Sequence, residues 1–274
     1  MSLANNEIVA NDAVIAKTVY RFDRKPGITA FIRLKDEAAS LEASLESIRG
    51  LFDAYVILIQ PSSDRTIEIC REFATAEAIV TIIHYPFESW PNGPGYKLQD
   101  PTSIRSRTFY YNFGCRFIET EFACKWDGDM IAAEGLDYVL DRFRSGRKKY
   151  LAFSGIECAD GICSTHLDRK STPNEVRVFP VLKRNNFYNG DYCERHISYR
   201  GLGKAHRKLF GEVVDEPVYY HFKHAKSLYS KTKAWPENWA SIEHFRKLLD
   251  VKVVENDGSL PVLTQSVLRE KNGL

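Results

Sequence analysis

Two aspartates one residue apart, Asp127 and Asp129 in the tetrapeptide WDGD, are the side chains whose type and spacing most directly suggest chemistry. On an extended segment, side chains two positions apart point to the same side, so both carboxylates can face one space. Gly128 between them permits a close approach of the backbone. Oxygen ligands suit Mg²⁺ or Mn²⁺, ions that keep waters and bridge substrate phosphates. The spacing indicates a divalent-cation site, and a solvated turn is the alternative for an isolated motif of this kind.

The context of this motif favours the cation site. WDGD closes the apolar segment EFACKW, which comes after three predicted strand–helix units. An open α/β sheet places its ligand crevice at the carboxyl ends of its strands. Other motifs of enzyme and metal chemistry are missing from the sequence: an EF-hand fails at Ile131 and Ala132, and neither a Walker loop nor a GxSxG elbow occurs.

The elements that would position the aspartates follow from alternating patterns of apolar residues. Short β-branched runs alternate with segments of helical period, which is typical of a parallel α/β sheet. In the first helical segment, Leu41, Leu45 and Ile48 recur at spacings of four and three, and Asp36 and Glu37 are expected in its first turn. Strands are predicted at 28–34, 54–59, 78–83 and 121–126, helices at 35–51, 62–74 and 103–118, and a long ordered loop at 85–103.

The chain changes character near residue 150. Strands are predicted at 151–158 and 175–184, and the tail from about Lys223 contains aromatic-rich helical segments. We expect an N-terminal extension at 1–26, a catalytic domain at 27–222 with a nucleotide half and an acceptor half, and a helical tail at 223–274.

Composition sets the broad class of the protein. The chain has 274 residues, of which 44% are hydrophobic and 27% charged, as in ordinary globular proteins. A formal net charge of +2 gives no strong drive toward nucleic acid, so no nucleic-acid partner is expected. Apolar runs are much shorter than the roughly 20 residues of a membrane-spanning helix, and the N-terminus does not read as a secretory signal. Six cysteines without CxxC spacing fit a reducing cytoplasm.

Several segments together resemble family 2 glycosyltransferases, particularly the branch that builds bacterial lipopolysaccharide core and other surface sugars. ITAFIRLKDEAASLEASLESI is similar to the first strand and helix of that family, with Asp36-Glu37 where an Asn-Glu pair usually stands. QPSSDRT at 60–66 is similar to its second-strand ending, with Gln60 in place of the usual aspartate. RSRTFYYNFGCRFIETEFACKWDGDM is similar to its helix and DxD block. The resemblance covers about residues 27–230.

Two downstream segments carry further resemblance. RVFPVLKRNNFYNGDYCE at 177–194 is similar to a strand followed by a Gly-x-x-His-Glu ending, with Cys193 in place of the histidine, and YYHFKHAKS at 219–227 is similar to a His-aromatic segment. The resemblance implies a GT-A fold, with a mostly parallel Rossmann-like sheet flanked by helices, a smaller acceptor-side β region and C-terminal helices. It implies Glu194 as catalytic base and His221, with His224 as the fallback, as a third metal ligand beside the two aspartates. The residues implied for the nucleotide are Arg33, Glu37, Gln60, Ser62, Arg105, Asn112 and Asp127.

The function expected from this resemblance is an inverting, Mn²⁺- or Mg²⁺-dependent glycosyltransferase that uses a nucleotide-diphosphate sugar. Its acceptor would be a saccharide or glycolipid, and peripheral contact with a membrane through the basic stretch KAHRK at 204–208 is an open alternative to a solvated face. Two other functions remain open: a metal-dependent nucleotidyl or phosphoryl transferase, and a non-catalytic nucleotide-sugar-binding protein.

Overall fold

Five strands from the first half of the chain form a parallel sheet. The computed structural model of the protein describes residues 6–11, 14–15, 23–76, 79–93, 95–159, 162–163 and 175–222. Neighbouring strands run parallel, which confirms the strand–helix–strand prediction. The Val, Ile and Leu side chains of β2, β3 and β4 are buried because helices cover both faces of the sheet, whereas Val9 on the edge strand β1 is exposed. The strands, in spatial order, are β1 (Asn6–Val9), β4 (Val80–His84), β3 (Ala54–Ile59), β2 (Lys25–Leu34) and β5 (Thr120–Asp127).

The second half of the chain extends the same sheet with mixed directions. Beyond β5, the order is β9 (Glu175–Pro180), β7 (Tyr150–Ala159), β12 (Gly211–His221) and β6 (Met130–Ala132), and β8 (Ile162–Cys163) pairs with β7. Strand β9 is antiparallel to both of its neighbours, β12 is parallel to β7, and β6 is antiparallel to β12. A separate hairpin consists of β10 (Phe187–Asn189) and β11 (Glu194–His196). The predicted α/β class with a mostly parallel sheet is confirmed.

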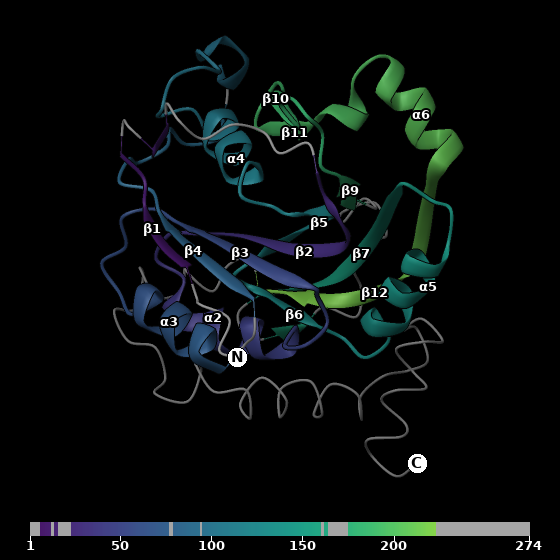
Figure 1. Cartoon of the computed structure of the whole chain (residues 1–274), viewed down its shortest axis with the longest axis horizontal. Coiled ribbons are helices and arrows are strands. Elements are labelled where there is room, and N and C mark those ends of the chain that lie inside the picture. Colours follow the sequence, from purple (N-terminus) through teal and green to yellow (C-terminus); the bar gives the residue numbers. More distant parts are fainter. Residues whose placement is uncertain are drawn as a thin grey trace.

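Helices pack on both faces of this sheet (Figure 1). Alternate β2 residues divide between two cores: Ile32 packs with Leu41 and Leu45 of α2, whereas Phe31 packs with Phe113 of α4. Figure 1 shows α4 on the same side as the β10–β11 hairpin, and α6 standing out at one edge. The helices are α2 (Ala38–Ser47), α3 (Thr66–Ala76), α4 (Arg107–Cys115), α5 (Leu136–Ser145) and α6 (Leu202–Phe210), and 3₁₀ turns occur at η1 (Tyr96–Leu98) and η2 (Ile197–Tyr199).

The start of α2 differs from the prediction. The helix begins at Ala38, so the expectation that Asp36 and Glu37 occupy its first turn is wrong. Asp36 has a left-handed φ of 51°, and its carboxylate accepts a hydrogen bond of 2.7 Å from the backbone N–H of Ser63. The N–H of Glu37 donates to Thr66 Oγ1 over 2.8 Å. These bonds join the loops that follow β2 and β3, and this link between strand ends outweighs the preference of acidic residues for a helix start.

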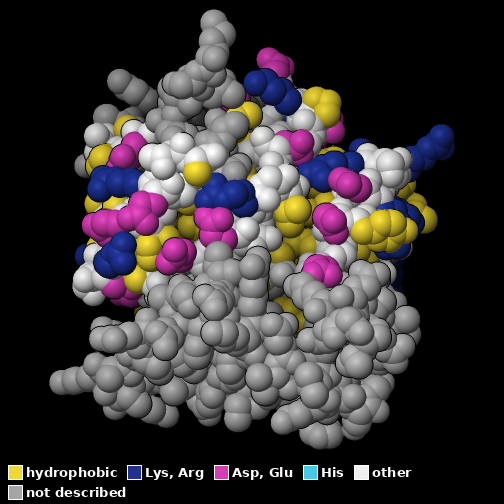
Figure 2. Space-filling model, turned by 90° about the horizontal axis from the view of Figure 1, so that it is seen from below, with side chains coloured by type: hydrophobic (Ala, Val, Ile, Leu, Met, Phe, Trp, Pro, Cys, Tyr) yellow, Lys and Arg dark blue, Asp and Glu magenta, His cyan; other side chains and the backbone are white. Residues whose placement is uncertain are grey.

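The edges of the predicted domains can be placed only in part. Residues 6–9, within the segment predicted as an extension, form β1 and pair with β4. The predicted helical tail at 223–274 lies outside the described residues, so the three-part division remains a prediction. Among the helices described, none has the length and hydropathy needed to cross a membrane. Viewed from below, the described surface shows acidic and basic side chains interspersed with hydrophobic ones (Figure 2).

Candidate active site

A cleft of about 1140 Å³ opens at the carboxyl ends of β2, β3 and β5 and extends toward β9, β11 and β12. This is the edge at which an open α/β sheet binds its ligands. The cleft brings together most of the side chains that the sequence predicted for the site. Those that line it are Arg33, Glu37, Gln60, Asp127, Asp129, Glu194 and His221.

The WDGD turn is held in place from helix α2. Ser40 donates from its hydroxyl to the carbonyl of Gly128 over 3.0 Å, and Ser44 donates to the carbonyl of Asp127 over 3.3 Å. The two serines are four residues apart and therefore lie on one face of the helix. A Cβ atom on Gly128 would stand only 2.6 Å from Cδ2 of Leu34, so any larger residue here would have to displace the buried Leu34 side chain. The helix thus fixes the backbone that carries both aspartates.

Asp127 lies between two arginines. Arg33 Nη2 is 2.5 Å from its Oδ1, and Arg177 Nη1 is 2.8 Å from its Oδ2. Arg33 and Asp127 are register partners on the adjacent parallel strands β2 and β5. Burial alone would raise the pKa of Asp127, but the positive charges of Lys125, Arg33 and Arg177 hold that pKa well below its usual value. Asp127 is therefore a carboxylate whose two oxygens are both engaged by guanidinium groups.

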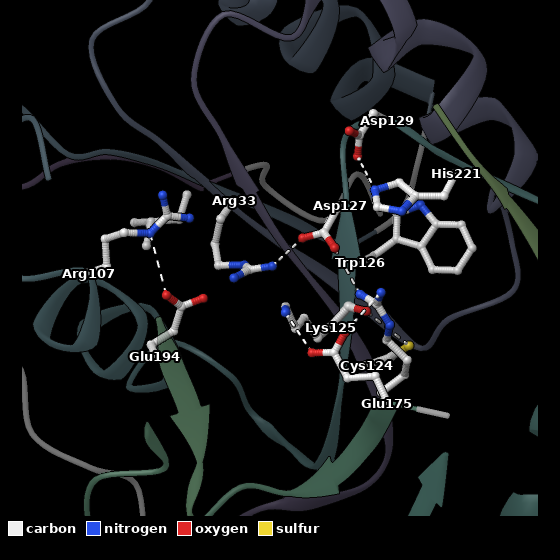
Figure 3. A network of polar contacts seen from close by, with 12 residues as sticks. Arg33, Arg107, Cys124, Lys125, Trp126, Asp127, Asp129, Glu175, Glu194 and His221 are labelled. Carbon is white, nitrogen blue, oxygen red and sulfur yellow. Dashed lines mark hydrogen bonds and ion pairs between the residues drawn. The ribbon is translucent and has the colours of Figure 1, made fainter. Parts of the chain in front are cut away.

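The ion pairs continue away from Asp127 along β9 (Figure 3). Arg177 Nη2 is 3.1 Å from Glu175 Oε2, and Lys125 Nζ is 2.8 Å from Glu175 Oε1. Burial opposes the ionised form of Glu175, but Arg177 and Lys125 lower its pKa to about 2. Arg177 also donates to the hydroxyl of Tyr219 over 3.2 Å. The floor of the cleft is thus a connected set of charges in which each buried cation contacts a carboxylate.

Asp129 pairs with His221 instead of with the arginines. His221 Nε2 is 3.3 Å from Asp129 Oδ1, and the carbonyl of Asp129 accepts a hydrogen bond of 2.8 Å from the N–H of Phe222. Burial would lower the pKa of His221, but its hydrogen bond to Asp129 and the negative charge of that carboxylate raise it. Figure 3 shows this pair beside Asp127, with the ring of His221 turned toward Asp129.

The predicted metal ligands are therefore only partly brought together. Asp129 and His221 are in contact, whereas the carboxylate of Asp127 is already paired with Arg33 and Arg177. Within the described ranges, no group of three or more His, Cys, Asp and Glu side chains is arranged to hold a metal ion. Two protein ligands still fit an ion that takes its other ligands from phosphates and water. His224, the alternative ligand, lies outside the described residues.

Glu194 lines another part of the cleft. It begins β11, its side chain is 5% exposed, and its Oε2 lies 3.5 Å from Nε of Arg107. Arg107 is the first residue of α4, where Ser106 caps the helix by accepting a hydrogen bond from the N–H of Phe109. In Figure 3 Arg33 stands between the Glu194–Arg107 pair and the Asp129–His221 pair. The cleft therefore presents a carboxylate on each side of a central arginine.

Three residues predicted to bind the nucleotide do not line the cleft. Asn112 is buried, and its amide oxygen accepts hydrogen bonds of 2.7 and 2.9 Å from the N–H groups of Asn186 and Phe187. Ser62 accepts from the N–H of Asp36 over 3.1 Å. The carbonyl of Arg105 accepts a bond of 2.8 Å from the N–H of Trp90. All three make contacts that organise loops beside the cleft, and direct contact with a nucleotide remains a prediction for them.

The sequence interpretation did not identify Arg107, Lys125, Glu175 and Arg177, which also line the cleft. A signal for two of them was present: Glu175 and Arg177 are two positions apart in a strand whose neighbours Val176 and Val178 are apolar. The spacing argument that placed Asp127 and Asp129 on one side of a strand applies to this pair as well. Lys125 and Arg107 carry no comparable pattern.

Comparison with known proteins places the chain in a family. The family described as beta-1,4-N-acetylgalactosaminyltransferase (CgtA) matches residues 22–158, which is half of the chain. No curated protein matches it.

The solved structures similar to this chain share little sequence with it. TarS from S. aureus in complex with UDP-GlcNAc is 16% identical with a TM-score of 0.47, over 89% of this chain and 70% of that one. A longer TarS structure is 16% identical with a TM-score of 0.45, and the chain spans 42% of its length while 89% of the chain is covered. Glucosyl-3-phosphoglycerate synthase from Mycobacterium tuberculosis, solved with Mn²⁺ and UDP, is 11% identical with a TM-score of 0.33, over 58% of this chain and 53% of that one. On the family match, which includes the WDGD turn, the protein belongs to the CgtA family of glycosyltransferases.

Proposed function

We propose that the protein transfers a sugar from a nucleotide-diphosphate donor to a hydroxyl group of a saccharide or glycolipid, with inversion, during synthesis of a bacterial cell-surface polysaccharide. The family description supports an N-acetylhexosamine as the sugar. The observation that carries the proposal is one cleft with the Asp129–His221 pair and two arginines on one side and the buried carboxylate of Glu194 on the other.

The donor diphosphate would lie against Arg33. The Nε and Nη1 atoms of Arg33 are buried and have no hydrogen-bond partner among the described residues, although its Nη2 atom is paired with Asp127. A buried donor without a partner is unfavourable, and a guanidinium group is well suited to phosphate oxygens. Gln60, just after β3, also has a buried Nε2 atom for which the described part of the chain offers no partner, and its Oε1 accepts from Ser89 over 3.3 Å. These free donors support an anionic, hydrogen-bonding ligand at the ends of β2 and β3.

A divalent cation fits this site through Asp129 and His221. Asp129 Oδ1 and His221 Nε2, which lie 3.3 Å apart, would supply one hard oxygen ligand and one imidazole nitrogen, a donor set that suits Mn²⁺. Such an ion, when bound, would neutralise the charge that develops on the departing nucleotide diphosphate. Asp127 would act by holding Arg33 and Arg177 in position, and we propose it as a direct ligand only if donor binding releases one of its arginines.

Glu194 would accept the proton of the acceptor hydroxyl as that oxygen attacks the anomeric carbon. Its carboxylate is almost fully shielded from water, which suits a general base that must contact the acceptor directly. Arg107, whose Nε lies 3.5 Å from Glu194 Oε2, would hold this carboxylate in position. Attack from the Glu194 side, with the diphosphate held on the Arg33 side, is a single displacement and inverts the anomeric centre.

The test is an activity assay that scans donors and metals. The protein is incubated with UDP-GalNAc, UDP-GlcNAc, UDP-glucose, UDP-galactose and GDP-mannose, with Mn²⁺, Mg²⁺ or EDTA, with and without a mixture of saccharide acceptors, and nucleotide release is measured. We expect release from one UDP-N-acetylhexosamine that increases when an acceptor is present and stops in EDTA. If nucleotide is released from none of these donors, with either metal, the proposal is contradicted.

A further inference from the structure

Helix α6 exposes an apolar face that no described part of the protein covers. Leu202 is 91% exposed and Leu209 is 69% exposed, and no residue of the helix is buried. The two leucines are seven residues apart, with Ala205 between them, so all three lie on one side of the helix. Large apolar side chains of a single protein in water are usually scattered, and a row of them along a helix marks a surface of contact.

The inner face of α6 is attached to the rest of the protein. His206 Nδ1 is 3.3 Å from the hydroxyl of Tyr150, and the guanidinium of Arg207 lies 4.3 Å from the ring centre of Tyr199. The N–H of Lys149 donates to the carbonyl of Phe210 over 2.8 Å, which ties the end of the helix to the segment before β7. The exposed leucines therefore belong to a helix with a defined orientation.

Positive charge surrounds these leucines. Lys204 and Lys208 are exposed on the flank of the same outer face, and Arg147 and Lys148 are exposed in the segment joined to the helix end. None of these four side chains forms an ion pair with a described residue. A helix that carries exposed leucines beside lysines has the two features of a segment that lies in the interface of an anionic bilayer: apolar side chains that enter the acyl boundary and cations that meet lipid phosphates.

We propose that α6 docks the protein onto an anionic lipid bilayer, with Leu202 and Leu209 in the interface and Lys204 and Lys208 against the headgroups. The helix is close to the cleft in space as well as in sequence: Tyr199, which Arg207 of α6 contacts, lines the cleft together with Glu194. Docking would bring the acceptor side of the cleft to the lipid surface. Docking through α6 would favour a lipid-linked acceptor, and this part of the inference rests on the proposed function.

The test measures binding of the whole chain to sedimented vesicles of phosphatidylcholine alone and of phosphatidylcholine with phosphatidylglycerol. We expect binding to the anionic vesicles only, weaker as salt is raised. Leu202→Ser should weaken this binding roughly tenfold, because the leucine side chain that enters the bilayer interface on docking is lost. Leu98→Ser is the matched control, since Leu98 is 89% exposed outside α6, and it should bind like the native protein.

Charge is tested separately. The double variant Lys204→Glu and Lys208→Glu should lose binding to anionic vesicles. Lys25→Glu with Arg65→Glu makes the same change in net charge at side chains that are 80% and 72% exposed elsewhere, and it should keep most of the binding. Equal losses from both pairs would mean that total charge, and not α6, governs binding, and would overturn the proposal.

Two further outcomes would also overturn it. One is that the native protein does not bind anionic vesicles. The other is that it forms a dimer that Leu202→Ser dissociates while vesicle binding is unchanged. Donor-dependent thermal stabilisation, measured on each variant, reports folding and the cleft independently of the lipid surface. If the native protein does not bind the donor, the proposed function is contradicted. If it binds the donor but not the vesicles, only docking through α6 is contradicted.

Discussion

Arg177 contacts both Asp127 and Glu175, donating to Asp127 Oδ2 over 2.8 Å and lying 3.1 Å from Glu175 Oε2. Arg33 pairs with the other oxygen of Asp127. The two aspartates of WDGD therefore have different roles. Asp127 organises the positive floor of the cleft, while Asp129 faces His221. Asp129 lies in the turn after β5 and not on the strand, so the predicted extended arrangement is wrong, although both residues line the cleft.

Replacing Arg177 should destabilise the protein strongly. In Arg177→Met, Asp127 keeps one arginine and Glu175 keeps only Lys125, so two carboxylates lose a charged partner. We expect the free energy of unfolding in urea to fall by about 2–4 kcal/mol. The exposed Arg184→Met is the control, with an expected change within about 0.5 kcal/mol. Similar losses in both variants would show that the ion-pair network does not stabilise the fold.

Replacing Glu194 should separate transfer from donor binding. Glu194→Gln keeps the size of the side chain but cannot accept a proton, so we expect kcat to fall by about 10²–10⁴-fold. The Kd for the donor, measured by calorimetry, should change little because the donor is held on the Arg33 side. Glu121→Gln, at an exposed position of β5, should leave kcat unchanged. Full turnover in Glu194→Gln would remove this residue from the role of base.

His196 should make stability depend on pH in the acid range. Burial lowers the pKa of His196 from 6.5 to about 3, so the folded protein keeps it neutral where the unfolded chain binds a proton. The stability associated with the neutral side chain is therefore complete above pH 6.5 and is lost as pH falls from 6.5 toward 3; at pH 5 the loss is about 2 kcal/mol. Urea unfolding between pH 8 and 5 measures it, and His196→Gln should show a shallower slope. Parallel curves for the two proteins would contradict the assignment.

Gly155 should not tolerate a side chain. A Cβ atom there would lie 2.3–2.5 Å from ring atoms of Tyr219, whose hydroxyl accepts a hydrogen bond from Arg177. Gly155→Ala must displace this ring, and we expect a loss of about 1–3 kcal/mol in unfolding free energy together with weaker donor binding. A variant with native stability and donor affinity would show that the ring can move without effect on the cleft.

Much of the fold could be predicted from local patterns. The strands at 28–34 and 54–59 are continuous apolar runs, and β2 and β3 occur there because both faces of the sheet are buried. The position of WDGD at the end of β5 follows from the same reasoning. These features depend on the burial of each segment and do not require knowledge of distant contacts.

The pairing within the site could not be predicted in this way. Arg177 reaches Asp127 only because β9 inserts antiparallel beside β5, a topology that no local pattern specifies. The role of the α2 serines could not be predicted for a similar reason. Ser40, Ser44 and Ser47 occur among leucines and alanines, and the spacing of the apolar residues predicts only an amphipathic helix. Their hydrogen bonds to the backbone at 127, 128 and 132 depend on where the helix packs.

The most direct test of the account is a thermal-shift measurement with UDP-N-acetylhexosamines, with and without Mn²⁺, on the native protein and on Asp129→Ala. We expect the nucleotide sugar to raise the melting temperature of the native protein when Mn²⁺ is present and Asp129→Ala to lose most of this rise. A native protein that no nucleotide sugar stabilises, or an Asp129→Ala variant stabilised as strongly as the native protein, would contradict it.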